Sequence, residues 1–204
     1  MTLTSRIHGK YVFNRRVRVL CRFVVELIPQ NARVLDVGCG DGLLAKLIMQ
    51  ERPDVEIQGI DVLLRNRSHI PVSLFDGGTI PHADESFDVV MFVDVLHHMP
   101  DPNILVREAA RVARQSIIIK DHTRNGLFAD TTLRFMDWVG NARHGVELPY
   151  NFWPRKRWLE FFGQLNLELQ LWKKDLNIYP RPASWLFDRS LHFIAQLKKK
   201  DCST

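Results

Sequence analysis

Cysteine is scarce in this chain. Its three residues, Cys21, Cys39 and Cys202, share no CxxC spacing and leave an odd thiol. Disulfide frameworks and zinc knuckles use cysteines in pairs at short, regular spacings. Neither kind of framework is supported here, and the cysteine pattern favours a reducing cytoplasm.

Long apolar runs are also missing. No stretch approaches the length that spans a bilayer, and near the amino end Val17, Val19 and Leu20 alternate with arginines, so we expect no signal peptide of the usual form. Internal repeats and low-complexity segments are absent as well. The 204 residues, 46% of them hydrophobic and 25% charged, predict one ordinary globular domain.

Positive charge is in modest excess. Lysine and arginine exceed aspartate and glutamate by 28 − 23 = 5. The excess gathers near the two ends, at Arg15, Arg16, Arg18, Arg22, Lys198, Lys199 and Lys200. Such clusters attract RNA, an anionic membrane or an acidic substrate, and an equally simple interpretation is a solvated basic face.

Helical and strand patterns alternate along the chain. Apolar residues recur at helical spacing from Val12 to Ile28, and Pro29 stops the pattern. Short apolar segments then alternate with helical ones, which predicts a parallel sheet covered on both faces. The expected strands are 33–37, 56–61, 72–75, 87–93 and 116–120, with helices over 43–48 and 104–112.

The remainder departs from that rhythm. We expect a helix at 133–139, another at 154–162, and two late strands at 165–172 and 191–197 that form an antiparallel pair closing the sheet. The expected organisation is a leading helix or lid at 1–29, a core at 30–122, an insertion at 123–164 and closing strands at 165–204.

The strongest local signal is the glycine-rich turn Gly38–Gly42 between a strand and a helix. Glycines let a backbone approach a ligand closely, and the helix that follows presents its positive end. A dinucleotide fingerprint requires a glycine where this chain has Leu43, so pyrophosphate binding is disfavoured. Asp61 follows Gly42 by 61 − 42 = 19 residues, the interval at which such folds place an acid on ribose hydroxyls.

Several ordered motifs resemble those of class I S-adenosylmethionine-dependent methyltransferases. Residues 34–42 (VLDVGCGDG) resemble the family's first motif, and 81–88 (PHADESFD) its signature before the fourth strand. Residues 95–101 and 107–112 are similar to the small-molecule branch that includes ubiquinone and menaquinone biosynthesis methyltransferases. The resemblance covers roughly residues 30–122. One departure follows Val112, where the family's Lys-Pro-Gly-Gly turn is missing.

The resemblance implies a Rossmann-like α/β fold of seven strands, five parallel and a final antiparallel hairpin, with helices on both faces. It also implies a cofactor, S-adenosyl-L-methionine. Its methionine portion would be surrounded by Asp36, Gly38, Cys39 and Gly40, its ribose held by Asp61, and its adenine placed against Val62, Asp76 and Gly77. Val93 and Asp94 would lie beside the sulfonium, and Tyr11 would fold over the cofactor.

Candidate catalytic residues follow two strands. Methyl transfer requires alignment of the nucleophile and, for a hydroxyl, removal of its proton. His97 and His98 follow the fourth expected strand, and Asp121 and His122 follow the fifth, so all four should meet at the carboxyl edge of the sheet. Each histidine is equally open to a packing role. No Asp/His cluster at metal-ligand spacing is apparent in the sequence, so we expect no metal.

The acceptor is predicted less closely. Residues 134–151 are dense in aromatic and polar groups, as in an acceptor pocket or simply a packed lid. Basic residues beside Trp153, Trp158 and Trp185, with Phe161 and Phe162, suggest peripheral contact with an anionic membrane, while packing of these side chains is the plainer alternative. The expected reaction is O-, C- or N-methylation of a small or lipid-like molecule; alternatives are RNA or protein methylation, or a non-catalytic S-adenosylmethionine-binding partner protein.

Overall fold

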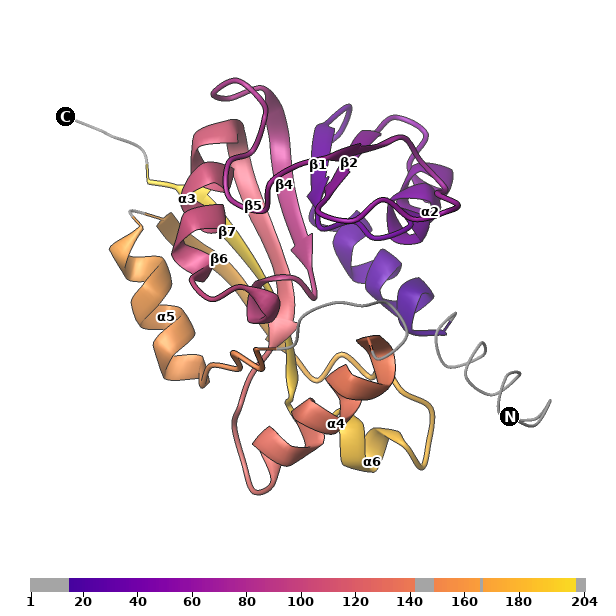
Figure 1. Ribbon diagram of the computed structural model, residues 1–204, viewed down its shortest axis with the longest axis vertical. Coiled ribbons are helices and arrows are strands. Elements are labelled where there is room, and N and C mark those ends of the chain that lie inside the picture. The colour runs from indigo at the N-terminus through magenta and orange to yellow at the C-terminus, as the bar shows by residue number, and fades with distance from the viewer. Residues whose placement is uncertain (1–14, 142–148, 166, 201–204) are drawn as a thin grey trace.

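A single seven-stranded mixed sheet organises the residues that the computed structural model describes, 15–141, 149–165 and 167–200 (Figure 1). The strand order is β3-β2-β1-β4-β5-β7-β6. The first five strands are parallel, as predicted: β1 (Arg33–Val37), β2 (Glu56–Asp61), β3 (Val72–Leu74), β4 (Phe87–Val93) and β5 (Ala113–His122). The antiparallel closing pair is also confirmed, by β6 (Leu167–Lys174) and β7 (His192–Lys199).

Helices cover both faces of the sheet because adjacent strand residues point to opposite sides. In β1, Val34 packs with the leading helix, residues 15–25, and with α2 (Leu43–Glu51). Its neighbour Leu35 packs on the other side with α3 (Pro102–Val112) and α5 (Arg155–Gln164). The continuous apolar strands therefore separate two hydrophobic layers, which confirms the Rossmann-like α/β architecture.

The leading helix packs its apolar stripe on the sheet. Val17, Leu20 and Val24 are buried, while Arg18 and Arg22 are exposed. Arg52, just after α2, donates hydrogen bonds to the carbonyls of Val25, Ile28 and Pro29 at 3.3, 3.0 and 3.0 Å and fixes the carboxyl end of this segment. The predicted start of the helix at Val12 and the residue Tyr11 lie outside the described residues.

Strand β5 is longer than the predicted 116–120. It begins at Ala113 directly after α3 and pairs with β4 on one side and with β7 on the other, in a register that runs to His122 opposite His192. Pairing with β7 extends the strand through its polar end. Asp121 and His122 are consequently the last two residues of β5 rather than residues that follow it.

The expected helix at 133–139 is the middle of a longer one, α4 (Ala129–Asn141). A short helix, α6 (Ser184–Phe187), lies in the connection between β6 and β7 and was not predicted, because four residues are too few for a periodic signal. Both helices lie at the end of the sheet toward which β4 and β5 point (Figure 1).

The aromatic residues near α5 are part of the core, which corrects the membrane interpretation for four of them. Trp153, Trp158, Phe161 and Phe162 are all buried. They pack on one another and on Phe193, with Trp158 lying 5.3 Å from the Phe193 ring centroid. Trp185, by contrast, is 69% exposed. None of the helices in the described part of the chain has the length and apolar character needed to cross a membrane.

Candidate active site

The glycine turn after β1 has the backbone that its sequence requires. Gly38, Gly40 and Gly42 have φ values of 73°, 61° and 72°, in the left-handed region that favours glycine. A Cβ on Gly38 would lie 2.6 Å from a methyl of Val95, whereas one on Gly40 would meet nothing within 4 Å. A side chain at Gly38 would therefore clash with Val95, whereas there is free space beside Gly40.

Asp61 connects the end of β2 to this turn. Its Oδ2 accepts the backbone N–H of Gly40 at 2.8 Å, and its Oδ1 accepts that of Leu63 at 2.9 Å. Asp36, at the penultimate position of β1, is 2% exposed. Burial, together with the nearby charge of Asp61, raises the pKa of Asp36 to about 7. Two carboxyl groups thus stand beside the glycine turn.

A cavity of about 220 Å³ lies over the turn. Five of the residues predicted to bind the cofactor line it: Asp36, Gly38, Cys39, Gly40 and Val93. Asp41 of the turn and Leu43 and Leu44 of α2 line it on the same side, and Arg16, Val17 and Leu20 of the leading helix also line it. The cavity therefore lies between the sheet edge and a segment that precedes the sheet in the chain.

The remaining predicted cofactor residues lie outside that lining. Val62 is 58% exposed and its Cγ1 stands 3.1 Å from where a Cβ of Gly77 would be. Asp76 accepts the backbone N–H groups of Gly78 and Thr79, both at 2.8 Å, which lowers its pKa. These residues form a rim beyond Asp61, on the side of the turn away from Val93.

Asp94 joins the cavity to a buried polar cluster. Its carboxylate pairs with Arg16, which lines the cavity, and with Lys120 of β5, which is fully buried. Although burial opposes its charge, Lys120 and Arg16 hold the pKa of Asp94 well below its usual range. The pKa of Lys120 is lowered by burial. Asp94 is thus an ionised carboxylate between two cations.

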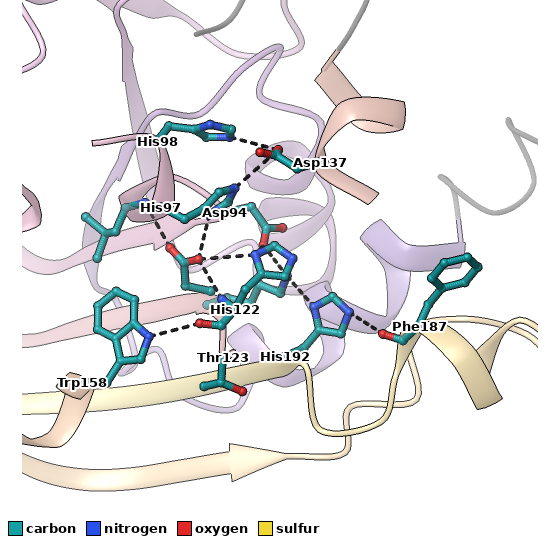
Figure 2. A network of polar contacts seen from close by, with 12 residues as sticks. Asp94, His97, His98, His122, Thr123, Asp137, Trp158, Phe187 and His192 are labelled. Atoms are coloured by element: carbon teal, nitrogen blue, oxygen red, sulfur yellow. Dashed lines mark hydrogen bonds and ion pairs between the residues drawn. The ribbon is translucent and has the colours of Figure 1, made fainter. Parts of the chain in front are cut away.

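The four predicted catalytic residues do meet at the carboxyl edge of the sheet (Figure 2). His97 and His98 belong to the short helix η1 (Leu96–His98) after β4. His97 Nδ1 lies 2.7 Å from Asp121 Oδ1, and His122 Nδ1 lies 3.4 Å from the same oxygen and 3.5 Å from Asp94 Oδ1. His122 therefore stands between the carboxylates of Asp121 and Asp94.

The surroundings of His97, His98 and His122 shift the pKa values of the three imidazoles in different directions. Burial opposes a charge on His97, but Asp121 outweighs it and raises the pKa of His97 to about 9. Burial and Lys120 lower the pKa of His122 to about 4, and burial with His97 lowers that of His98. At neutral pH the cluster therefore contains one imidazolium and two neutral imidazoles.

Several residues of this network were not singled out in the sequence. Lys120 carried a weak signal, since it is a cation at the end of the apolar run 117–119, and Arg16 was noted only as part of the basic cluster near the amino end. Asp137 of α4 belongs to the segment 134–151 that was predicted as an acceptor pocket or lid, but nothing singled it out within that segment; its Oδ1 lies 3.6 Å from Nε2 of both His97 and His98. His192 of β7, 3.3 Å from Lys120 Nζ through its Nδ1, was equally hidden, because its partners are distant in sequence. The structure also brings together histidines and carboxylates at metal-ligand spacing, which the sequence had not revealed.

The fold and the turn are those of a class I methyltransferase. A family model described as "Methyltransferase domain" matches residues 11–179, and the chain belongs to that family. A 27-O-demethylrifamycin SV methyltransferase from Amycolatopsis mediterranei is 36% identical over 103 residues, 43% of this chain and 38% of that protein. A ubiquinone biosynthesis O-methyltransferase from Proteus mirabilis is 35% identical over 94 residues, covering 40% and 38%. The chain spans about two fifths of the length of such curated relatives.

Solved structures share the fold at low identity. A SAM-dependent methyltransferase from Thermotoga maritima, described as a possible histamine N-methyltransferase, superposes with a TM-score of 0.64 at 16% identity, covering 97% of this chain and 96% of that one. The [4+2]-cyclase SpnF superposes with a TM-score of 0.63 at 18% identity, covering 88% and 79%. A cyclase and methyltransferases thus share this fold, so the reaction must be argued from the site.

Proposed function

We propose that the chain transfers the methyl group of S-adenosylmethionine to a hydroxyl oxygen of a small-molecule or lipid-like acceptor. One observation carries the proposal: Arg16, which lines the cavity over the glycine turn, pairs with Asp94, whose Oδ1 lies 3.5 Å from His122 Nδ1 in the histidine cluster. A methyl donor and an acceptor need adjoining sites of these two kinds, because the reaction is a direct displacement that depends on alignment.

The residues around the cavity fit the donor. Gly40 leaves space for a ligand against the backbone, and Asp36 suits the methionine ammonium. Arg16 suits the methionine carboxylate, which would compete with Asp94 for the guanidinium. Asp61 would accept ribose hydroxyls beside its bond to Gly40, and Val62, Asp76 and Gly77 would meet adenine. S-adenosylmethionine supplies an electrophilic methyl group on a sulfonium.

The acceptor would lie beside the histidine cluster. His122 is the imidazole nearest the cavity, through its approach to Asp94, and no hydrogen-bond partner for its buried Nδ1 lies among the described residues. We assign His122 as the group that takes the hydroxyl proton and Asp121 as the carboxylate that positions His97 and the backbone of His122. Residues 123–164, which include α4, would form the acceptor side.

The test is methyl transfer from methyl-labelled S-adenosylmethionine to a panel of small phenols and macrolide-like alcohols. Label should enter the organic-soluble fraction, and His122→Gln should slow that transfer while S-adenosylhomocysteine affinity stays within about twofold, since the residue does not line the cavity. Parallel reactions with total RNA and total protein distinguish the rivals. Label in either polymer would replace this acceptor class, and donor binding without any transfer would indicate a partner protein.

A second element of the proposal is peripheral contact with an anionic membrane. Helices α4 and α6 meet through stacked Phe135 and Phe187, whose ring centroids are 6.3 Å apart. Around them an exposed apolar surface includes Leu127, Phe128, Trp138, Trp185 and Leu186. Exposed arginines flank it at 124, 134, 181 and 189. Apolar side chains beside cations suit an anionic bilayer, and this surface lies beside the proposed acceptor site, where a lipid-like molecule would enter.

A further inference from the structure

The histidine cluster continues beyond His122 to a group of three side chains from two elements. His97 and His98 of η1 direct their Nε2 atoms at Asp137 of α4, and each lies 3.6 Å from Asp137 Oδ1 (Figure 2). The two imidazole rings lie side by side, with centroids 4.1 Å apart. His97 and Asp137 are buried, and the His98 side chain is 17% exposed. Solvent therefore reaches this group at His98.

These distances are those of ligands around a common ion. A separation of 3.6 Å is too long for a hydrogen bond between nitrogen and oxygen. Ligand atoms that bind zinc at about 2.0–2.1 Å in a tetrahedral arrangement stand roughly 3.4 Å from one another. The two printed separations are close to that value, and all three ligand atoms lie within 4.8 Å of one another.

Asp121 gives His97 the support that metal-binding histidines have. Its Oδ1 lies 2.7 Å from His97 Nδ1, and the carboxylate also accepts the backbone N–H groups of Leu96 and His122 at 3.0 and 2.7 Å. With its oxygens engaged, Asp121 is suited to fix the imidazole and not to bind an ion. A carboxylate on the far nitrogen of a histidine is the usual second layer of such sites, because it fixes the orientation of the ring. An ion would displace the proton that His97 Nε2 carries at neutral pH and take up the lone pair that this proton occupied.

We infer that His97 Nε2, His98 Nε2 and the Asp137 carboxylate form a binding site for one divalent transition-metal ion, with Asp121 as the residue that orients His97. Two imidazoles and one carboxylate suit zinc, cobalt or manganese better than magnesium, which prefers oxygen ligands. Three protein ligands leave a coordination position for water or a hydroxyl, as in catalytic sites.

The position of the site gives the ion a role that rests on the proposed function. The ion would lie on the acceptor side of His122 and bind the acceptor hydroxyl oxygen. Coordination would lower the pKa of such a hydroxyl, so that its proton passes more readily to His122. The oxygen then bonds to the methyl carbon as the carbon–sulfur bond of the donor breaks, and S-adenosylhomocysteine is the leaving group. The ion undergoes no change of oxidation state in this role. Binding of the ion itself does not depend on the identity of the reaction.

The experiment is a titration of the untagged full chain with Co²⁺, followed by visible absorption and calorimetry, with no acceptor present. One Co²⁺ should bind per chain and give the ligand-field bands of a nitrogen and oxygen site. Asp121→Asn should weaken binding about 10–100-fold, the usual effect of losing an outer carboxylate, and Asp137→Asn and His98→Gln by at least about 100-fold. Matched controls are Asp130→Asn, an exchange of the same kind earlier on α4, and His82→Gln, a partly buried histidine before β4.

Each variant is also titrated with S-adenosylhomocysteine, which reports an intact fold and tests the donor site separately. Retained donor binding with lost Co²⁺ binding supports the inference. Absence of saturable Co²⁺ binding by the natural chain, or equal affinity in Asp137→Asn, His98→Gln and the controls, would overturn it. If the natural chain does not bind S-adenosylhomocysteine, the proposed function is refuted, and the Co²⁺ result still tests the metal site separately.

Discussion

The carboxylate of Asp61 accepts the backbone N–H of Gly40 at 2.8 Å, so one side chain joins the end of β2 to the glycine turn after β1. The same carboxylate is the acid that the nineteen-residue interval predicts for ribose. Its two roles are compatible, because each carboxylate oxygen has more than one acceptor site.

Replacing Asp61 should therefore weaken donor-site binding. In Asp61→Ala we expect the affinity for S-adenosylhomocysteine to fall by about 1.5–3 kcal/mol, the range for hydrogen bonds to a charged group. Isothermal calorimetry measures the change, and Glu56→Ala, at the opposite end of β2, is the control. Unchanged affinity in Asp61→Ala would remove the ribose assignment.

Asp36 should make the stability of the ligand-free protein depend on pH. Its folded-state pKa is raised from 3.8 to about 7, so the charged form is disfavoured by folding. The sign follows: the penalty is absent below about pH 4, grows as pH rises, and is complete above about pH 7. Asp36→Asn should remove up to roughly 4 kcal/mol of it, at 1.36 kcal/mol per pKa unit. Urea unfolding at pH 5 and pH 8 measures the effect, and an equal gain at both pH values contradicts the assignment.

Lys120 should be needed for stability because it pairs inside the protein with Asp94. The substitution Lys120→Met keeps an unbranched side chain of nearly the same length and removes its charge, which leaves Arg16 as the cation paired with Asp94. Breaking a buried pair from one side costs about 3–5 kcal/mol. Chemical denaturation should show a loss of this order, and the double variant Lys120→Met/Asp94→Asn should recover part of it. A double variant as unstable as the sum of the two single variants would show that the two groups are not coupled.

The surface of α4 and α6 should govern vesicle binding. The natural chain should sediment with anionic and not with zwitterionic vesicles at low salt, because each cation near such a surface contributes about 1 kcal/mol. The double substitution Trp185→Ser/Leu186→Ser should reduce sedimentation. Ile104→Ser removes a similarly exposed apolar residue, 51% exposed, from α3 and should have no effect. Equal sedimentation with both vesicle types would argue for a freely soluble acceptor.

The parallel part of the fold was predictable because its signals are local. Strands β1 and β4 and the centre of β5 are short apolar runs, and the turn Gly38–Gly42 needs glycine for its backbone. Strand β5 was predicted to end too early, at residue 120. Asp121 and His122 are polar and extend the strand only because β7, distant in sequence, pairs with them. For the same reason the sequence left open whether Trp158 packs or is exposed, since its partner Phe193 is far along the chain.

In the candidate site, too, the residues placed by strand order were predictable and those placed by tertiary contacts were not. The edge that holds His97, His98, Asp121 and His122 follows from strand order, because the carboxyl ends of parallel strands meet. Asp137 was not predictable, because nothing in an amphipathic helix shows which acid will face a histidine pair forty residues away. The role of Arg16 was not predictable either, because it depends on the leading helix lining the cavity, which is a tertiary contact.

That wall has a thermodynamic consequence. Arg16, Val17 and Leu20 face the glycine turn across the cavity, while Arg52 holds the other end of the same segment by the carbonyls of Val25, Ile28 and Pro29. A ligand in the cavity would touch both sides at once and bind the docked arrangement more tightly than an undocked one. With the donor placed there as proposed, its binding is linked to docking of the leading helix, and the amide protons of that helix should exchange more slowly once the cavity is filled.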